Sequence, residues 1–257
     1  MGRYILKLIE IVDLKKSFGN KEVLKGINLL IEAGKTTVIL GPSGSGKTLL
    51  LRHIIGLVSP DSGKVLLDGV NIFDMSEREL KRVRRRFGMV FQMGALFDSM
   101  TVADNVAFGL KRFTRLSSDE VMRRVSSMLE LVGLSGTEML YPDELSGGMK
   151  KRVAIARALA FEPDIVLFDE PTTGLDPISA ANMDRLIYDV VNSTGVTAVV
   201  VTHDLESASF VADKVAMIYE GQIIQVGSMD EILMSENPIV KRFVEARERA
   251  VADGKRV

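Results

Sequence analysis

Short apolar runs alternate along this chain with stretches in which apolar residues recur at helical spacing. Several of the short runs are apolar at consecutive positions, which is typical of strands that are covered on both faces. These runs are Thr36–Leu40, Val65–Leu67, Gly88–Phe91, Ile165–Phe168 and Thr197–Val201. Their alternation with helical stretches predicts an α/β fold with a largely parallel central sheet.

The strand pattern disappears between Gln92 and about Ala160. Segments such as Ser118–Val132 carry apolar residues at helical spacing, with charged residues between them. This spacing is typical of amphipathic helices. We therefore predict a helical subdomain over residues 93–160, inserted into the α/β core.

The C-terminal part of the chain predicts a hairpin and a terminal helix. Val215–Tyr219 and Gln222–Val226 are largely apolar runs on either side of Glu220-Gly221, a pair that suits a tight turn. Ile239–Val251 carries its apolar residues on one side of a highly charged helix. Residues 239–257 are therefore predicted to form a charged helical tail.

The composition and charge of the chain exclude some classes of partner and of catalytic chemistry. The 257 residues are 46% apolar and 26% charged, which is enough for a sizeable core in a single domain that spans residues 1–257. The 33 Lys and Arg nearly balance the 34 Asp and Glu, so we expect no nucleic-acid partner. The absence of cysteine excludes thiol catalysis and cysteine-ligated metals. Because no run of about 18 apolar residues occurs, we expect that the chain itself does not cross a bilayer.

One glycine-rich segment carries a phosphate-binding motif, the P-loop. Residues 41–48 match the pattern G-x-x-x-x-G-K-[ST] and lie between a predicted strand and a predicted helix, as this motif requires. Its glycines let backbone N–H groups point at phosphates, and the start of the helix adds a favourable field. Lys47 is expected to reach the β- and γ-phosphates and Thr48 to ligate Mg²⁺. The predicted nucleotide-binding residues here are Gly41, Pro42, Ser43, Gly44, Ser45, Gly46, Lys47, Thr48 and Leu49.

Three further side chains stand where predicted strands end. Asp169 and Glu170 follow the run Ile165–Phe168, at the strand end where open α/β sheets bind ligands. We expect Asp169 to contact Mg²⁺ and Glu170 to act as the general base that polarises an attacking water. His203 closes the next predicted strand, so its imidazole is expected to stabilise charge in the transition state. His53, in the predicted helix after the P-loop, is interpreted as a packing or surface residue.

A second helix start also suits a phosphate. Ser146, Gly147 and Gly148 precede the helical run from Lys150 to Ala160, so a serine cap and two glycine amides stand at a positive helix end. One P-loop already surrounds one face of a nucleotide. We therefore expect this second site to close on the nucleotide of another copy, which implies a head-to-tail dimer.

The order of these motifs resembles the ABC (ATP-binding cassette) ATPases over nearly the whole chain. In that family's terms, the sequence contains a Walker A motif at 41–48, a signature at 145–149, a Walker B motif at 165–170 and a D-loop at 174–177. The resemblance implies a P-loop NTPase with a RecA-like core, an N-terminal antiparallel β part and an inserted helical subdomain. It also implies an ATPase that uses ATP and Mg²⁺.

The resemblance assigns further roles to single residues. It places Gln92, the Q-loop residue, on Mg²⁺ and the attacking water, and His203 at the γ-phosphate. Asp176 would communicate across the dimer, and Asp176-Pro177 also has the pattern of a helix N-cap followed by proline. Phe18 stands in the position of the aromatic ring that stacks on adenine. The signature residues expected at the nucleotide are Ser146, Gly147, Gly148 and Met149.

Two features are similar to one branch of the family. The signature ends in Met149, where the wider family usually has Gln, and residues 91–97 read FQMGALF. Both resemble the ATPases that energise MCE-type phospholipid transporters. This implies a peripheral homodimer on the cytoplasmic face of the inner membrane, with a membrane permease, an MCE-domain lipid-binding protein and a STAS-domain subunit as partners.

Two other functions stay open at this point. An importer ATPase for amino acids or another small polar solute shares every catalytic residue, and a soluble non-transport ABC ATPase ranks below it. Seven of the 13 methionines fall within residues 89–149, and such an adaptable surface suits a helix of a membrane subunit, although core packing is the alternative. The basic run 81–86 receives no role.

Overall fold

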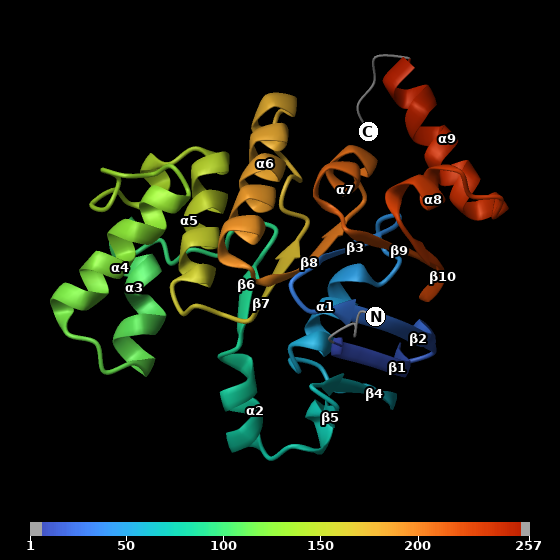
Figure 1. Cartoon of the computed structure of the whole chain (residues 1–257), viewed down its shortest axis with the longest axis horizontal. Coiled ribbons are helices and arrows are strands. Elements are labelled where there is room, and N and C mark those ends of the chain that lie inside the picture. The colour runs from blue at the N-terminus through green and yellow to red at the C-terminus, as the bar shows by residue number, and fades with distance from the viewer. Residues whose placement is uncertain (1–6, 253–257) are drawn as a thin grey trace, which may run out of the picture. The chain divides into compact units, whose positions relative to one another are not determined.

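The computed structural model describes residues 7–252, which form two compact units. The first unit contains the described residues up to Asp74 and those from Val201 onward, and the second contains residues 75–200. Both units combine helices with strands, as Figure 1 shows. Among the described residues, no helix has the length and apolar character needed to span a membrane.

The first unit contains a four-stranded antiparallel sheet in the order β2-β1-β4-β5. Its strands are β1 (Lys7–Phe18), β2 (Lys21–Glu32), β4 (Ser62–Leu67) and β5 (Val70–Asn71). Buried apolar residues recur along the long strands at alternate positions, such as Ile9 and Ile11 in β1 and Leu29 and Ile31 in β2. This sheet confirms the antiparallel β part that the resemblance implies.

The first unit also contains part of a second sheet. The five residues of β3 (Thr36–Leu40) are all buried. This strand pairs in parallel with β9 (Lys214–Tyr219), which pairs antiparallel with β10 (Gln222–Gly227) across the predicted hairpin. The helical elements of this unit are α1 (Lys47–Ile54), η1 (Ile72–Asp74), α7 (Leu205–Val211), α8 (Met229–Leu233) and α9 (Pro238–Ala252).

The second unit contributes its own parallel strands. β6 (Phe87–Val90) pairs in parallel with β7 (Ile165–Asp169), and β8 (Thr197–Thr202) is the next strand in the order β8-β7-β6. The last two residues of β8 belong to the first unit. Helix α6 (Pro177–Thr194) connects β7 with β8 and begins at Asp176, as the Asp-Pro pattern predicts.

Helices make up most of the regular structure between β6 and β7. Helices α3 (Val102–Phe113), α4 (Ser118–Leu131) and α5 (Gly147–Leu159) pack against one another and lie close together in Figure 1. Helix α2 (Glu77–Arg84) and the 3₁₀ turn η2 (Pro142–Glu144) are the other helical elements of this unit. Residues 93–160 contain no strand. The boundaries 93–160 stay a prediction, because the compact unit around these helices is wider and includes β6, β7 and α6.

The structure confirms the sequence pattern where the pattern was strong. The five predicted strands are β3, β4, β6, β7 and β8, and the predicted helical runs are α1, α4, α5 and α9. The predicted tail begins as α9, and its residues 253–257 lie outside the described part of the chain. The elements without a prediction of their own are β1, β2, β5, α2, α3, α7, α8 and the 3₁₀ turns η1 and η2.

Candidate functional site

The P-loop connects β3 directly to α1, and its shape comes from glycine. Gly44 and Gly46 have φ angles of +80° and +104°, in the left-handed region that glycine adopts without strain. Gly46 is also the N-cap of α1, and glycine has no side chain with which to cap the helix. Gly46 therefore does not cap the first backbone N–H groups of α1 with a side chain, and N–H groups at a helix start can donate to an anion.

Two buried polar side chains of the P-loop fit a phosphate ligand. Lys47 is 5% exposed, and its ammonium donates to the carbonyls of Gly41 at 2.8 Å and Pro42 at 3.1 Å. Ser45 is also 5% exposed, and its hydroxyl has no hydrogen-bond partner among the described residues. Burying a hydroxyl without a partner is costly, and a phosphate oxygen would supply one.

The start of the P-loop is fixed by its neighbours in the first unit. The amide of Gly41 donates to the carbonyl of Thr202 at 3.3 Å. A Cβ atom on Gly41 would lie 2.2 Å from the carbonyl oxygen of Ile218, so only glycine fits at this point of the loop. His203 follows Thr202 directly and is half-buried. The structure therefore brings the beginning of the P-loop next to the strand end that carries His203.

Phe18 and His53 occupy opposite environments. Phe18 ends β1 with 55% of its surface exposed, and the Lys16 ammonium lies 5.7 Å from the centre of its ring. An exposed ring beside a cation suits the predicted contact with a nucleotide base. His53 is fully buried in α1, and its Nδ1 lies 2.7 Å from the carbonyl oxygen of Leu49. The interpretation of His53 as a packing residue is confirmed.

The two predicted carboxylates lie at the end of β7 in the second unit. Asp169 and Glu170 are 5% and 8% exposed. Glu170 has a φ angle of +49°, a conformation that costs a residue with a side chain about 1–2 kcal/mol. The hydroxyl of Thr173 donates to Glu170 Oε2 at 3.1 Å. Buried strain at a strand end is typical of a functional position.

Gln92 is exposed just after β6, and the segment behind it is held from α5. Ala95 has a φ angle of +48°. The guanidinium of Arg157 donates to the carbonyls of Gly94 and Ala95, each at 2.7 Å. Burial lowers the pKa of Arg157 but leaves a group of this kind charged at neutral pH. A cation on α5 therefore fixes the course of the chain after Gln92.

The second predicted phosphate site is a regular helix start. Ser146 is exposed and caps α5, accepting from the amide of Met149 at 3.3 Å. A Cβ atom on Gly148 would have no neighbour within 4 Å in the described chain, so the backbone here is open. Asp176 caps α6 by accepting from the amides of Ile178 and Ser179, both at 3.0 Å. A hydrogen bond with the Ser179 side chain, together with these amide bonds, lowers the pKa of the Asp176 carboxyl.

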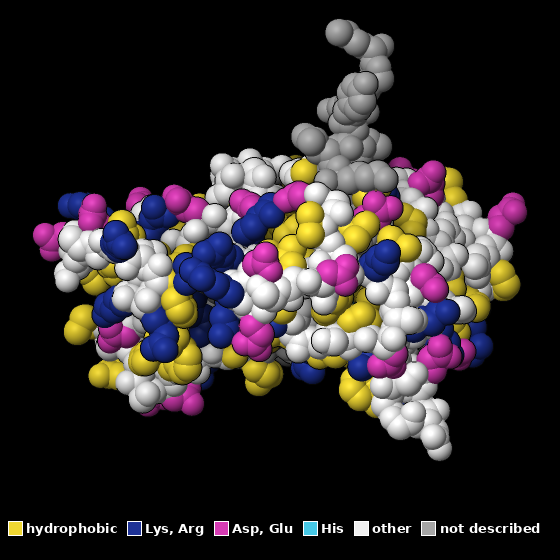
Figure 2. Space-filling view, turned by 90° about the horizontal axis from the view of Figure 1, so that it is seen from below, with side chains coloured by type: hydrophobic (Ala, Val, Ile, Leu, Met, Phe, Trp, Pro, Cys, Tyr) yellow, Lys and Arg dark blue, Asp and Glu magenta, His cyan; other side chains and the backbone are white. Residues whose placement is uncertain are grey.

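A groove of about 760 Å³ lies in the second unit, and its walls combine aromatic and basic side chains. These lining residues are Lys81, Arg84, Arg85, Phe87, Phe91, Phe97, Phe108, Arg112, Phe113, Arg157 and Phe161. On the face that carries α2, Figure 2 shows Lys and Arg side chains gathered beside hydrophobic ones. Of the seven methionines of residues 89–149, only Met89 lines this groove. None of the seven is buried, and Met93, Met122 and Met139 are exposed, so these methionines lie at the surface and not in the core.

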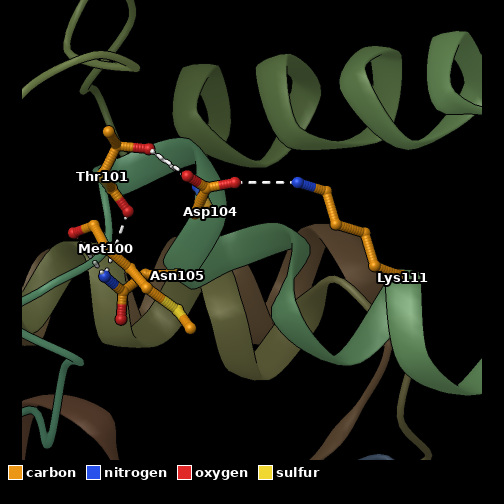
Figure 3. A network of polar contacts seen from close by, with 5 residues as sticks. All are labelled: Met100, Thr101, Asp104, Asn105 and Lys111. Carbon is orange, nitrogen blue, oxygen red and sulfur yellow. Dashed lines mark hydrogen bonds and ion pairs between the residues drawn. The ribbon is translucent and has the colours of Figure 1, made fainter.

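Hydrogen bonds at the start of α3 hold the segment that brings Phe97 into the groove. The Asn105 side chain is fully buried, accepts from the amide of Phe97 at 2.8 Å and donates to the carbonyls of Phe97, Met100 and Thr101. Figure 3 shows Asp104 between Thr101 and Lys111, whose ammonium lies 2.8 Å away and lowers the pKa of the Asp104 carboxyl. These bonds attach the segment that carries Phe97 to the start of α3.

The predicted site residues divide between the two units. The first unit carries Phe18, His203 and the P-loop with Leu49, and the second carries Gln92, Asp169, Glu170, Asp176 and the signature. Four residues of this region had no prediction, namely Lys151, Thr173, Arg157 and Asn105. The motif patterns do not include them, because each acts through a hydrogen bond to another segment. A basic residue within the mostly apolar stretch of α5 is the one signal that could have found two of them, Lys151 and Arg157.

Comparison with known proteins gives a consistent result. A family model described as "ABC transporter" matches residues 24–173. The chain is 42% identical over 254 residues, 99% of this chain and 93% of the relative, to the Escherichia coli K12 "Intermembrane phospholipid transport system ATP-binding protein MlaF". It is 41% identical over 239 residues, 93% of this chain and 69% of the relative, to the Mycobacterium leprae "Probable ribonucleotide transport ATP-binding protein mkl".

A solved structure supports the same fold. The dimeric post-hydrolysis state of the ATP-binding cassette MJ0796, bound to ADP and Pi, superposes with a TM-score of 0.79 at 33% identity. The match covers 86% of this chain and 99% of that chain.

Proposed function

Since this chain belongs to the ABC transporter family, it is an ATP-hydrolysing cassette, and we propose that it drives a transporter of phospholipid between the inner membrane and periplasmic or outer-membrane carriers. The observation that carries this proposal is the 42% identity to the phospholipid transport protein MlaF over 99% of this chain. The match also covers 93% of MlaF, so it extends over nearly the full length of both proteins.

A polar solute is the second candidate cargo. The relative mkl is named for ribonucleotide transport and is 41% identical to this chain. The match leaves about a third of mkl uncovered, since it spans 69% of that protein. For this reason the phospholipid assignment ranks first and a small polar solute second.

The site residues receive the following roles in hydrolysis. The P-loop amides and Lys47 bind the β- and γ-phosphates, and Phe18 stacks on the adenine. Glu170 accepts a proton from the attacking water, which Gln92 helps to orient. His203 donates to the γ-phosphate as negative charge develops there. The buried Ser45 hydroxyl and the placement of the Lys47 ammonium against the P-loop carbonyls support the phosphate-binding part of this proposal.

Mg²⁺ is the cofactor that these residues suit. Thr48, Gln92 and Asp169 supply a hydroxyl, an amide and a carboxylate oxygen, which are ligands that Mg²⁺ prefers. When bound, the ion would neutralise charge on the phosphates. Asp169 at the end of β7 and Thr48 in the first turn of α1 support this assignment.

We assign a homodimer as the working state. Ser146, Gly147 and Gly148 would cover the nucleotide held by the partner's P-loop, and Asp176 would signal between the two copies. The open backbone at Gly148 and the serine cap of α5 suit a phosphate from outside the chain. The cassette MJ0796 is dimeric in its solved structure, which supports the same arrangement for this chain.

The groove is assigned to a helix of the membrane permease. Its phenylalanines suit the apolar face of a helix, and its basic rim suits acidic residues on the same helix. Arg85 and Arg112 stack on Phe113 with distances of 5.2 and 5.8 Å to the ring centre, so their charges remain at the mouth of the groove. The cassette would then work at the cytoplasmic face of the inner membrane, with an MCE-domain protein and a STAS-domain subunit as further partners.

The test is a pull-down from detergent-solubilised membranes of the native host. Tagged Glu170→Gln protein, loaded with ATP, is the bait, and mass spectrometry identifies proteins and lipids. We expect a polytopic permease, an MCE-domain protein and phospholipid. A bait that also carries Arg85→Glu and Arg112→Glu should lose the permease, while a Lys64→Glu bait, altered outside the groove, should retain it.

Each other outcome contradicts a different part of the proposal. A permease that arrives with a solute-binding protein and without phospholipid would move the cargo to a small polar solute. Soluble partners alone would overturn the transporter assignment. Retention of the permease by the doubly substituted bait would remove the groove as its binding site.

A further inference from the structure

Lys151 is a buried cation that the proposed hydrolysis does not use. It lies in the second turn of α5, with 6% of its surface exposed. Its ammonium donates to the carbonyls of Pro171 at 2.7 Å and Thr173 at 2.6 Å. Both carbonyls belong to the turn that follows Glu170. A long flexible side chain from another element therefore ties down this turn at two points.

Thr173, in the same turn, also donates hydrogen bonds directly to Glu170. The Thr173 hydroxyl donates to Glu170 Oε2 at 3.1 Å, and the Thr173 amide donates to the Glu170 carbonyl at 3.3 Å. Glu170 itself stands at a φ angle of +49°. Hydrogen bonds from Thr173 therefore hold both the backbone of Glu170 and the direction of its carboxylate. Thr173 therefore links the two charged groups. Its carbonyl accepts from the Lys151 ammonium, and its hydroxyl donates to the Glu170 carboxylate.

We propose that Lys151 and Thr173 are positioning residues for Glu170. Lys151 fixes the turn through two carbonyls, and Thr173 directs the carboxylate toward the water that attacks the γ-phosphate. The inference rests on the proposed role of Glu170 as the general base. Neither residue touches the nucleotide in this scheme, so both act on the rate of hydrolysis and not on binding.

The electrostatics of Lys151 agree with this role. Burial lowers its pKa, whereas the negative charge of Glu170 raises it. The two charges therefore stabilise each other in a place with little water. A neutral side chain at position 151 would remove both the two hydrogen bonds and this compensation, and the turn would be free to relax from its strained conformation.

Arg152 provides a matched control one residue away on α5. Its guanidinium also donates to a backbone carbonyl, that of Val132, at 2.9 Å. Val132 is the C-cap of α4 and is not part of the turn that carries Glu170. Loss of Arg152 should therefore disturb packing between helices without changing the direction of the Glu170 carboxylate.

The experiment compares steady-state ATP hydrolysis by purified full-length variants. Thr173→Val removes the hydroxyl at nearly constant shape, and Lys151→Met removes the donor while keeping the apolar stem. Rates are expressed per ATP-binding site, as counted by calorimetry, so that misfolded protein does not lower kcat. We expect kcat to fall by about 10²-fold in both variants, the loss typical of a misplaced catalytic group, with KM for ATP unchanged.

The conservative variants and controls make the test decisive. Thr173→Ser keeps the hydroxyl and Lys151→Arg keeps the cation, so both should recover most of kcat. Arg152→Met should lower the melting temperature and leave kcat per site at the wild-type value. Two outcomes would overturn the positioning role. One is that Thr173→Val or Lys151→Met raises KM for ATP and leaves kcat unchanged. The other is that Thr173→Ser fails to recover kcat.

Failure of this inference is distinguishable from failure of the proposed function. If Glu170→Gln is inactive while Thr173→Val and Lys151→Met hydrolyse ATP at the wild-type rate, only the positioning role is wrong. If Glu170→Gln itself hydrolyses ATP normally, the assignment of the base is wrong, and the positioning role is lost with it.

Discussion

The P-loop and the turn that carries Glu170 follow two similar strands and take their shapes from different sources. β3 and β7 are each five residues long and buried throughout. After β3 the chain turns at Gly44 and Gly46, which adopt positive φ angles without a Cβ penalty. After β7 it turns at Glu170, a residue with a side chain, and Lys151 on α5 holds this turn in place.

The difference separates two ways of building a site. The P-loop carries its conformation in its own residues, so a short motif is enough to specify it. The turn at Glu170 needs contacts that offset a backbone cost of about 1–2 kcal/mol, and these contacts come from a helix some twenty residues earlier in the chain. The first kind of loop is visible in a sequence, and the second requires a structure.

The largest effect is expected when the base is removed from the turn. Glu170→Gln should lower kcat by about 10²–10⁴-fold, because the amide cannot accept the proton of the attacking water. ATP affinity by calorimetry should stay at the wild-type value. Glu162 is the matched control, since it also has a positive φ angle, +53°, but is exposed and paired with Arg124 at 2.6 Å. Normal hydrolysis in Glu170→Gln, or a comparable loss in Glu162→Gln, would contradict the assignment.

An intermediate effect is expected when the glycine of the P-loop is replaced. In Gly46→Ala the new Cβ would lie 2.8 Å from Leu24 at a φ angle of +104°. Strain and overlap together should destabilise the fold by about 2–4 kcal/mol and weaken ATP binding, as measured by thermal unfolding and calorimetry. Gly34→Ala is the control, because Gly34 has a φ angle of +67° but a Cβ atom added there would meet no other described atom within 4 Å. Equal losses in the two variants would show that strain alone matters.

The smallest effect concerns His53, on the helix that the P-loop begins. Burial lowers its pKa below the ordinary value of 6.5, so the folded chain resists protonation that the unfolded chain accepts. Stability is therefore complete above about pH 6.5 and is lost as the pH falls toward the lowered value. His53→Phe should reduce this loss.

The measurement for His53 is the melting temperature at about pH 7.5 and about pH 5.5. Wild type should lose more than His53→Phe, by about 2–4 °C for each kcal/mol of stability at this chain length. Equal pH dependence in the two proteins would mean that His53 titrates as it does in the unfolded chain.

Much of the fold was predictable because its signals are local. Thr36–Leu40 forms a buried strand in which every position is apolar or threonine, and the chain shows that composition directly. Asp176 and Pro177 start α6 with a cap and a preset φ angle, and both signals lie within two residues. The phosphate-binding loop has the same character, since its glycines and lysine are contiguous.

The remainder was not predictable because its causes are separated along the chain. β1 and β2 pair over their whole lengths, with several irregularities in register, and their charged residues hid the alternation of buried positions. Lys151 resembles any basic residue of an amphipathic helix until Pro171 and Thr173 are placed beside it. The groove likewise gathers phenylalanines from several elements, whereas the sequence drew attention to methionines.

Three basic side chains of α5 each donate a hydrogen bond to a backbone carbonyl oxygen of another segment. Lys151, Arg152 and Arg157 act in this way on the turn after β7, the end of α4 and the chain after Gln92. Every amino acid supplies a carbonyl oxygen, so the held segments can exchange side chains without losing the bond. In related sequences the three basic residues of α5 should therefore vary little. The residues whose carbonyls they bind should vary freely, except where their side chains have another role.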